Sequence, residues 1–293
     1  MSQCAMILVH MEDISTAPRV TALVVSRNCA EDLRRCLAGL ESTVPRNMLE
    51  ILVVDNGSRD ESATMDSEFP SAQFLRMPKN FGITKALNIG LRTAKGEYIF
   101  FLPPQFVVGP DTVAKLVDRL EARPEAAAVC PRVDRWYPLP TTDVLAAMWK
   151  TGVFSGARTV DEREEEVPVE FPRGAPILVR RSFVAGMNYF DDRFGEFGPY
   201  LELCWQIRGA GKKILVLPQV QVNGTVEEQT SQETAYVADR AIGSAVYVGK
   251  HFGTWPGIAF RIKAALSSLA GLNFGLFGAI AGGQKIDGNQ AGG

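Results

Sequence analysis

The sequence has little net charge and few of the residues that hold metals or disulfide frames. Its formal net charge is −2, which gives no electrostatic footprint for a nucleic-acid partner. It has two histidines and five cysteines, and the cysteines are odd in number and scattered. This spacing excludes a disulfide frame and a zinc site and indicates a reducing compartment. We therefore expect the cysteines to be small core residues.

We do not expect the apolar patch at residues 5–9 to be a secretory signal, and no stretch has the hydropathy of a confident spanning helix. No charged residue lies between Lys263 and Lys285, a stretch long enough to cross a bilayer, but five glycines dilute it. It predicts an amphipathic helix on a membrane surface or on a partner, with a basic cluster near anionic headgroups. The cluster consists of Lys250, His251, Arg261 and Lys263. A helix that packs on its own domain is an equally open alternative.

What the sequence does have is a regular alternation of apolar strands and amphipathic helices. Such alternation predicts an α/β domain with a mostly parallel sheet covered by helices on both faces. The predicted strands are 20–26, 50–55, 73–77, 97–102, 174–180 and 213–217, the last closed by Pro218. Helices are predicted at 31–40, after Gly82, between Pro110 and Pro124, and around 201–207. The regularity fails between residues 131 and 170.

Two of these strands end at the edge of the sheet where we expect a ligand to bind. The strand at 97–102 runs into Pro103, which cannot donate to a sheet ladder, so a loop at the carboxyl edge of the sheet follows. Open α/β sheets bind ligands at that edge. The strand at 50–55 places Asp55 at the same edge, where its carboxylate either accepts hydrogen bonds from a ligand or caps the following helix.

Taken together, the motifs resemble those of the family 2 glycosyltransferases of the GT-A fold, especially their rhamnosyltransferase-like branch. The resemblance covers residues 19–225 and is carried by VTALVVSRN, ILVVDNGSRDES, NFGITKALNIGL, GEYIFFL, GAPILVRRSF, FDDRF and LELCWQIRGAGKKILVLP. It implies a Rossmann-like, mostly parallel sheet with helices on both faces. With the patterns at the two ends of the chain, we expect three parts: a disordered extension at 1–18, a glycosyltransferase-like domain at 19–250, and an amphipathic or apolar tail at 251–293.

The resemblance implies a nucleotide-binding pocket at the ends of the first two strands. In the family, an acidic residue at the position of Asp55 contacts the nucleoside of a sugar nucleotide. The same pocket would be lined by Ser26, Arg27, Asn28 and Asn56. Lys85 would lie beside the diphosphate, although the residues around it favour an ordinary solvated lysine on a helix.

The first departure from the family lies in the loop after residue 102. Relatives carry Asp-x-Asp or Asn-Pro-Asp there, and this pair holds a divalent cation against the diphosphate. Here the residues are Pro103, Pro104 and Gln105. Magnesium and manganese prefer carboxylate ligands, and these side chains offer only one neutral amide oxygen. No cofactor is therefore predicted, and magnesium or manganese would bind weakly and only with a bound nucleoside diphosphate.

The second departure concerns the general base. The family uses the Asp of a Glu-Asp pair, and the two positions here read Pro199 and Tyr200. A phenol with a pKa of about 10 is a poor base near neutrality. Glu202 matches another acidic position of the family and points away from Tyr200 on a helix. Glu196, on a glycine-flanked segment, is the candidate substitute. A third departure is Asn223-Gly224, where many relatives have a histidine.

These departures favour a non-catalytic or impaired relative, a pseudoenzyme that keeps a nucleotide-sugar pocket and serves as a binding subunit or scaffold in glycan assembly. The alternative is an active, metal-independent, inverting glycosyltransferase that moves a sugar from a nucleotide donor to a polysaccharide or lipid-linked acceptor. The expected partners are a nucleotide sugar or nucleoside diphosphate, a glycan-assembly protein and a membrane surface, with no nucleic acid. The expected location is the cytoplasm, peripheral on the cytoplasmic membrane.

Overall fold

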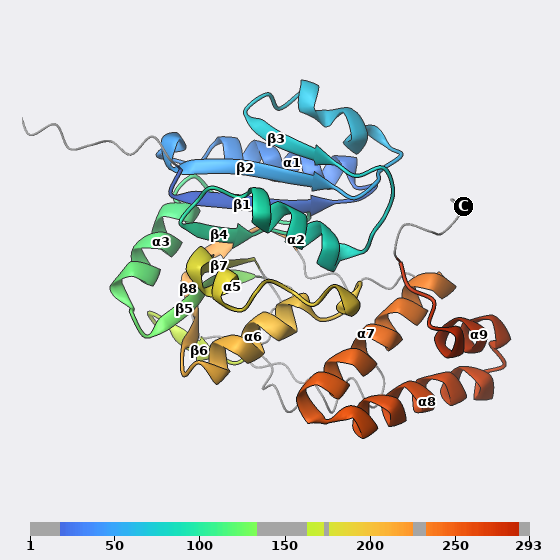
Figure 1. Cartoon of the computed structure of the whole chain (residues 1–293). Coiled ribbons are helices and arrows are strands. Elements are labelled where there is room, and N and C mark those ends of the chain that lie inside the picture. Colours follow the sequence, from blue (N-terminus) through green and yellow to red (C-terminus); the bar gives the residue numbers. More distant parts are fainter. Residues whose placement is uncertain (1–17, 134–162, 173–175, 225–232, 287–293) are drawn as a thin grey trace, which may run out of the picture.

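The computed structural model describes residues 18–133, 163–172, 176–224 and 233–286. A single eight-stranded sheet with the order β3-β2-β1-β4-β7-β5-β8-β6 forms its centre (Figure 1). The predicted amino-terminal extension lies outside the described residues except for Pro18. The predicted α/β class, with a mostly parallel sheet, is confirmed.

The first half of the sheet is entirely parallel, and every strand predicted for it is present. Its elements are β1 (Val20–Ser26), α1 (Ala30–Glu41), β2 (Leu49–Asp55), β3 (Ala72–Arg76), α2 (Ile83–Thr93) and β4 (Tyr98–Phe101). Short 3-10 helices lie at Arg46–Met48 (η1) and Glu61–Ser67 (η2). The chain crosses the sheet in opposite directions through α1 and α2, so right-handed connections place these helices on opposite faces (Figure 1).

The second half is mixed, and the sequence predicted it only in part. Its elements are α3 (Thr112–Ala122), β5 (Ala126–Val133), β6 (Val167–Val169), β7 (Ile177–Arg180), α5 (Arg181–Gly186), η3 (Asp192–Phe194), α6 (Pro199–Gly209) and β8 (Lys213–Val222). β7 lies antiparallel between β4 and β5. The prediction that Pro218 ends the last strand is wrong. The pairing of β8 with β5 shifts register between Leu217 and Gln221, so the proline falls in an irregularity of the ladder.

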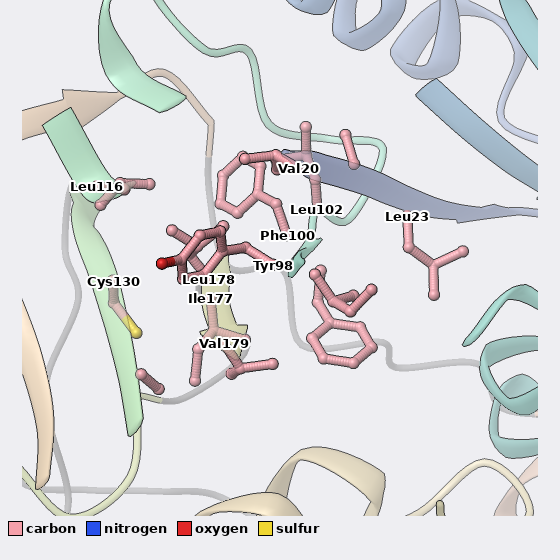
Figure 2. Packing of buried hydrophobic residues seen from close by; sticks show 14 of the residues in the cluster. Val20, Leu23, Tyr98, Phe100, Leu102, Leu116, Cys130, Ile177, Leu178 and Val179 are labelled. Carbon is pink, nitrogen blue, oxygen red and sulfur yellow. The ribbon is translucent and has the colours of Figure 1, made fainter. Parts of the chain in front are cut away.

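β4 contributes three of the largest fully buried side chains of the core, Tyr98, Phe100 and Phe101. Tyr98 and Phe100 are at most 1% exposed. Figure 2 shows them packed among Val20 and Leu23 of β1, the side chains of β7, Leu116 of α3 and Cys130 of β5. The cysteines of the described residues are free thiols, three of them buried and Cys29 half-buried, in line with the expected role as core residues.

The carboxyl-terminal helices pack together beside the sheet (Figure 1). They are α7 (Thr234–Phe252), α8 (Thr254–Ala270) and α9 (Phe274–Gly282), and the boundary predicted at residue 250 falls inside α7. The uncharged stretch after Lys263 is not one helix. It breaks at a turn where Asn273 caps α9 by accepting the N–H of Leu276. Within the described part of the chain, no helix is long and apolar enough to cross a membrane.

Candidate functional site

The carboxyl ends of β1 and β2 meet at one edge of the sheet, as the sequence predicted. Ser26 pairs with Asp55 in the strand register. The loops beyond these residues are joined, because the Asn56 N–H donates to Ser26 O at 2.9 Å and the Asn28 N–H donates to Ser58 Oγ at 3.0 Å. The structure therefore brings together four of the predicted nucleotide-binding residues: Ser26, Asn28, Asp55 and Asn56.

Asp55 is 3% exposed and accepts the Ser58 N–H on Oδ1 at 3.0 Å. This bond closes the turn after β2. The following helix is capped by Asp60, whose carboxylate accepts the Ser62 N–H, so the helix-capping alternative for Asp55 is wrong. Among the described residues, Oδ2 of Asp55 has no hydrogen-bond partner, and Ser26 Oγ is buried without one. A polar ligand edge would satisfy both groups.

Asn56 and Asn80 connect this edge to the start of α2. Asn56 Nδ2 donates to Asn80 Oδ1 at 2.8 Å, and Asn56 Oδ1 accepts the Phe81 N–H at 3.0 Å. Asn80 Oδ1 also accepts the N–H of Gly82, a glycine with φ of +82°. Because both ends of the Asn56 amide are bonded within the protein, this side chain positions the loop before α2.

Glu196 lies at the amino terminus of α2, where its Oε1 accepts the Ile83 N–H at 3.2 Å. The preceding carbonyl of Gly195 accepts both the N–H and the hydroxyl of Thr84. Burial and the neighbouring Asp239 carboxylate raise the pKa of Glu196 to about 7, while the Ile83 N–H and the Arg27 guanidinium oppose the shift. Since Arg27 directly follows β1, Glu196 lies at the same edge as the predicted nucleotide-binding residues.

Asp239 of α7 holds the loop that carries Gly195 and Glu196. Its fully buried carboxylate accepts the N–H groups of Glu196 and Ile286, and Lys285 Nζ lies 3.7 Å from its Oδ1. Burial raises the pKa of Asp239 in spite of these neighbours. Gly195 has φ of +60°, and a Cβ there would lie 2.2 Å from Asp239 Oδ2, so only glycine fits. The carboxyl-terminal helices thus fix the position of Glu196.

Tyr200 and Glu202 contribute to the packing of α6. The Tyr200 ring packs edge-on against Phe101 with centroids 5.8 Å apart, and burial raises the pKa of its phenol above the ordinary value. Glu202 is 1% exposed and accepts from Lys250 Nζ at 2.7 Å, with His251 Nε2 at 2.5 Å. Burial alone would raise the pKa of Glu202, but hydrogen bonds led by that of Lys250 hold it below its usual range. The Glu202 carboxylate is therefore engaged within the fold, and burial makes the Tyr200 phenol a weaker acid than usual.

The loop at 103–105 is a tight turn that packs against the end of β8. The Phe106 N–H donates to Pro103 O at 3.1 Å, and a Cβ on Gly224 would lie 2.5 Å from the Gln105 carbonyl oxygen. Within the described ranges no group of three or more His, Cys, Asp or Glu side chains could hold a metal ion. In this loop the only side-chain donor is the neutral amide oxygen of Gln105, which does not fit a tightly held magnesium or manganese ion.

Lys85 lies half-buried in the first turn of α2, on the Glu196 side of the edge. Burial lowers the pKa of Lys285, and the nearby charge of Lys85 adds to this effect. A role for Lys85 beside a diphosphate stays a prediction. Sequence reasoning placed Arg27 in the pocket but missed Asn80 and Asp239 as parts of the site. The Asn-Phe-Gly motif signals Asn80, but no local pattern points to Asp239.

Comparison with known proteins agrees with the resemblance read from the motifs. The glycosyl transferase family 2 model matches residues 21–181. Glycosyltransferase AglE of Haloferax volcanii is 33% identical over 93 residues, 30% of this chain and 31% of that protein. The N-acetylglucosaminyl-diphospho-decaprenol L-rhamnosyltransferase of Mycobacterium tuberculosis is 23% identical over 252 residues, 76% of this chain and 82% of that protein. The chain spans less than half the length of the relatives it matches at 28–33% identity.

Solved structures show the same fold. The mannosyltransferase PcManGT from Pyrobaculum calidifontis, in complex with GDP-Man and Mn2+, is 18% identical with a TM-score of 0.57, over 92% of this chain and 88% of that one. GalNAc-T7 with UDP, GalNAc and Mn2+ is 16% identical with a TM-score of 0.56, over 77% and 48%. These likenesses establish a GT-A fold. Because the family model covers more than half of the sequence, the chain belongs to glycosyl transferase family 2.

Proposed function

We propose that this chain binds a nucleotide sugar or nucleoside diphosphate at the edge lined by Ser26, Asn28 and Asp55, and that it is a non-catalytic or strongly impaired member of its family. It would serve as a binding subunit or scaffold in glycan assembly. The observation that carries the proposal is Tyr200, which occupies the family's base position and is packed against Phe101. The free thiols suit a cytoplasmic location.

The relatives support this class of ligand. The Mycobacterium tuberculosis relative is named as a rhamnosyltransferase, and PcManGT holds GDP-Man. In this chain, the paired strand ends offer a carboxylate oxygen and a buried hydroxyl that lack partners among the described residues. Both suit the polar edge of a nucleobase or ribose.

Binding of a nucleoside diphosphate is expected to be almost independent of manganese. The loop at 103–105 offers no carboxylate, so the ion gains little beyond its contacts with the diphosphate itself. In calorimetry with UDP, GDP and dTDP, the dissociation constant of the nucleotide that binds should change by less than about threefold when manganese is added. Strengthening by more than about tenfold would contradict the proposal.

A variant that restores the family's carboxylate provides the positive control for the manganese experiment. Pro103→Asn combined with Gln105→Asp restores the family's Asn-Pro-Asp pattern in a loop that is otherwise unchanged. We expect this double variant to bind the same nucleotide more tightly with manganese than without it, because a carboxylate is a harder ligand than an amide. The wild-type protein should show no such gain.

Replacing Asp55 with asparagine is expected to weaken nucleotide binding by about 10- to 100-fold, because a hydrogen bond to a charged group is lost. Asparagine keeps an oxygen that can accept the Ser58 N–H, so the turn after β2 should survive. Asp60→Asn is the matched control, since Asp60 caps η2. Calorimetry with both variants checks the assignment, and unchanged affinity for Asp55→Asn would remove Asp55 from the pocket.

A second function is favoured by the position of the Glu196 carboxylate at the amino terminus of α2, where burial and the Asp239 carboxylate raise its pKa to about 7. A general base is most effective when its pKa is close to the working pH. In metal-independent transfer, the Glu196 carboxylate would take the proton of the acceptor hydroxyl as that oxygen attacks the anomeric carbon and the nucleoside diphosphate leaves. Release of nucleoside diphosphate from a panel of nucleotide sugars separates the two functions. The proposed one predicts none above background.

A further inference from the structure

Exposed large hydrophobic side chains gather on the carboxyl-terminal helices. Of the eight in the described part of the chain, seven lie between residues 252 and 274. They are Phe252, Trp255, Ile258, Ile262, Leu266, Leu272 and Phe274. Figure 1 shows α8 on the side of these helices that faces away from the sheet. An apolar surface of this kind on an otherwise ordinary protein marks an interaction site.

The outer face of α8 is apolar along its length. Trp255, Ile258, Ile262 and Leu266 follow one another at intervals of three or four residues, which places them on one side of the helix. Their exposed fractions are 80%, 44%, 54% and 55%. Lys263 is exposed on the same helix. This face is therefore as apolar as the side of a helix that normally packs into a core.

The inner face of α8 consists of small residues. Gly257, Ala265 and Ser268 are its buried positions, and α8 packs through them on α7 and α9. A Cβ on Gly257 would lie 2.7 Å from the Gly249 Cα, so α7 and α8 approach closely at this point. An ordinary surface helix buries its large apolar residues and exposes small or polar ones. α8 does the reverse.

The charge of this region suits an anionic surface. α8 carries two cations, Arg261 and Lys263, and no acidic residue, although the whole chain has a net charge of −2. A second copy of the chain would bring cations of the same sign against this helix, which disfavours it as the occupant. A helix with a large apolar face, a tryptophan and no acidic residue matches the chemistry of the interface of an anionic membrane.

Basic residues predicted to contact lipid headgroups form contacts within the protein. Lys250 and His251 contact the buried Glu202, and Arg261 donates to the Ile280 carbonyl at the end of α9. Lys263 is exposed on α8, and the Lys250 side chain stays 36% exposed on α7 while it pairs with Glu202. The outer face of α8 is therefore mainly apolar, and it lies within the tail predicted at 251–293.

We propose that the apolar face of α8, extended by Leu272 and Phe274, inserts into the interfacial region of an anionic membrane with the helix axis in the membrane plane. α8 has 17 residues and ends at a turn, so it lies on the surface of the bilayer. Leu272, 77% exposed with φ of +57°, follows α8 in the turn before α9. The attachment is separate from the nucleotide site and holds whichever function that site performs.

Flotation of the full chain with vesicles tests the proposal. We expect the wild-type protein to float with phosphatidylcholine vesicles that contain phosphatidylglycerol and to bind far less to pure phosphatidylcholine. Trp255→Ser combined with Ile262→Ser should reduce the floated fraction by at least about fivefold. Because both side chains are exposed, the double variant should keep the wild-type melting temperature and nucleotide affinity. Val44→Ser, which removes another exposed apolar side chain away from α8, should float like the wild type.

Three outcomes would overturn the proposal. One is a wild-type protein that stays unbound with anionic vesicles. Another is a double variant that floats as well as the wild type. The third is self-association in the absence of lipid, measured by sedimentation velocity, that the double variant abolishes, since this would assign the face to a second copy.

Discussion

Replacing Glu202 with alanine is expected to lower the free energy of unfolding by about 1–3 kcal/mol, because it leaves the buried His251 ring without its hydrogen-bond partner. The carboxylate joins α6 to α7 through Lys250 and His251. His251 cannot swing out to water, since its ring lies 4.6 Å from that of Trp205 and 4.5 Å from that of Tyr247. Urea denaturation followed by circular dichroism measures the loss.

Two further variants sharpen this measurement. Glu202→Gln keeps the shape and one acceptor oxygen, so its loss should be smaller than that of the alanine variant. Glu68→Ala breaks the exposed pair with Arg34 and should cost about 0–1 kcal/mol. Equal losses for Glu202→Ala and Glu68→Ala would show that burial does not strengthen the α6–α7 contact.

The Glu202 contribution should also depend on pH. Hydrogen bonds hold the pKa of folded Glu202 below its usual range in spite of burial. A lowered carboxylate pKa stabilises the fold at pH values above the unfolded pKa of about 4.3 and stops doing so as the pH falls through the folded pKa. The difference between wild type and Glu202→Ala should therefore shrink below about pH 4.

The first half of the sheet could be predicted because each strand is an apolar run bounded by turn-forming residues, as in residues 50–55 before Asn56 and Gly57. β5 could not. Its sequence, AAAVCPRV, opens with three alanines, which favour helix, and contains Pro131, which argues against a central strand. Its place between β7 and β8 depends on tertiary packing that no local pattern encodes.

The candidate site also contains residues that the sequence could predict and residues that it could not. Ser26 and Asp55 could be predicted because parallel strands end at a common edge. Asp239 could not, since it meets Glu196 from 43 residues away on a helix that the sequence did not predict. The interpretation of Lys250 and His251 as headgroup ligands failed because a sequence shows which residues are charged but not which are paired with a buried Glu202.

Replacing Glu196 with glutamine is expected to stabilise the protein at pH 8. The pKa of Glu196 is about 7 in the fold, above the value of about 4.3 in an unfolded chain. A raised carboxylate pKa means that the fold favours the protonated form, so stability is lost as the pH rises from about 4.3 to 7, by about 3 kcal/mol in all. Glutamine resembles the protonated acid and does not ionise, so the variant should avoid this loss.

Urea denaturation at pH 5 and at pH 8 measures the effect. The advantage of Glu196→Gln over the wild type should grow between the two values, because the wild-type carboxylate ionises in that interval. Glu97→Gln, at an exposed glutamate just before β4, controls for the removal of one negative charge. An advantage of the same size at both values would contradict a raised pKa at Glu196.

The same variant decides between the two functions. A carboxylate that destabilises the fold near neutral pH is a feature that active sites share, because catalysis needs a base in its ionised form. If the wild type releases nucleoside diphosphate, Glu196→Gln should slow that release by about 100- to 10,000-fold, and the wild-type rate should reach half its maximum at about pH 7. If neither protein turns over and both bind nucleotide equally, Glu196 is a positioning residue that accepts the Ile83 N–H and links α2 to Asp239.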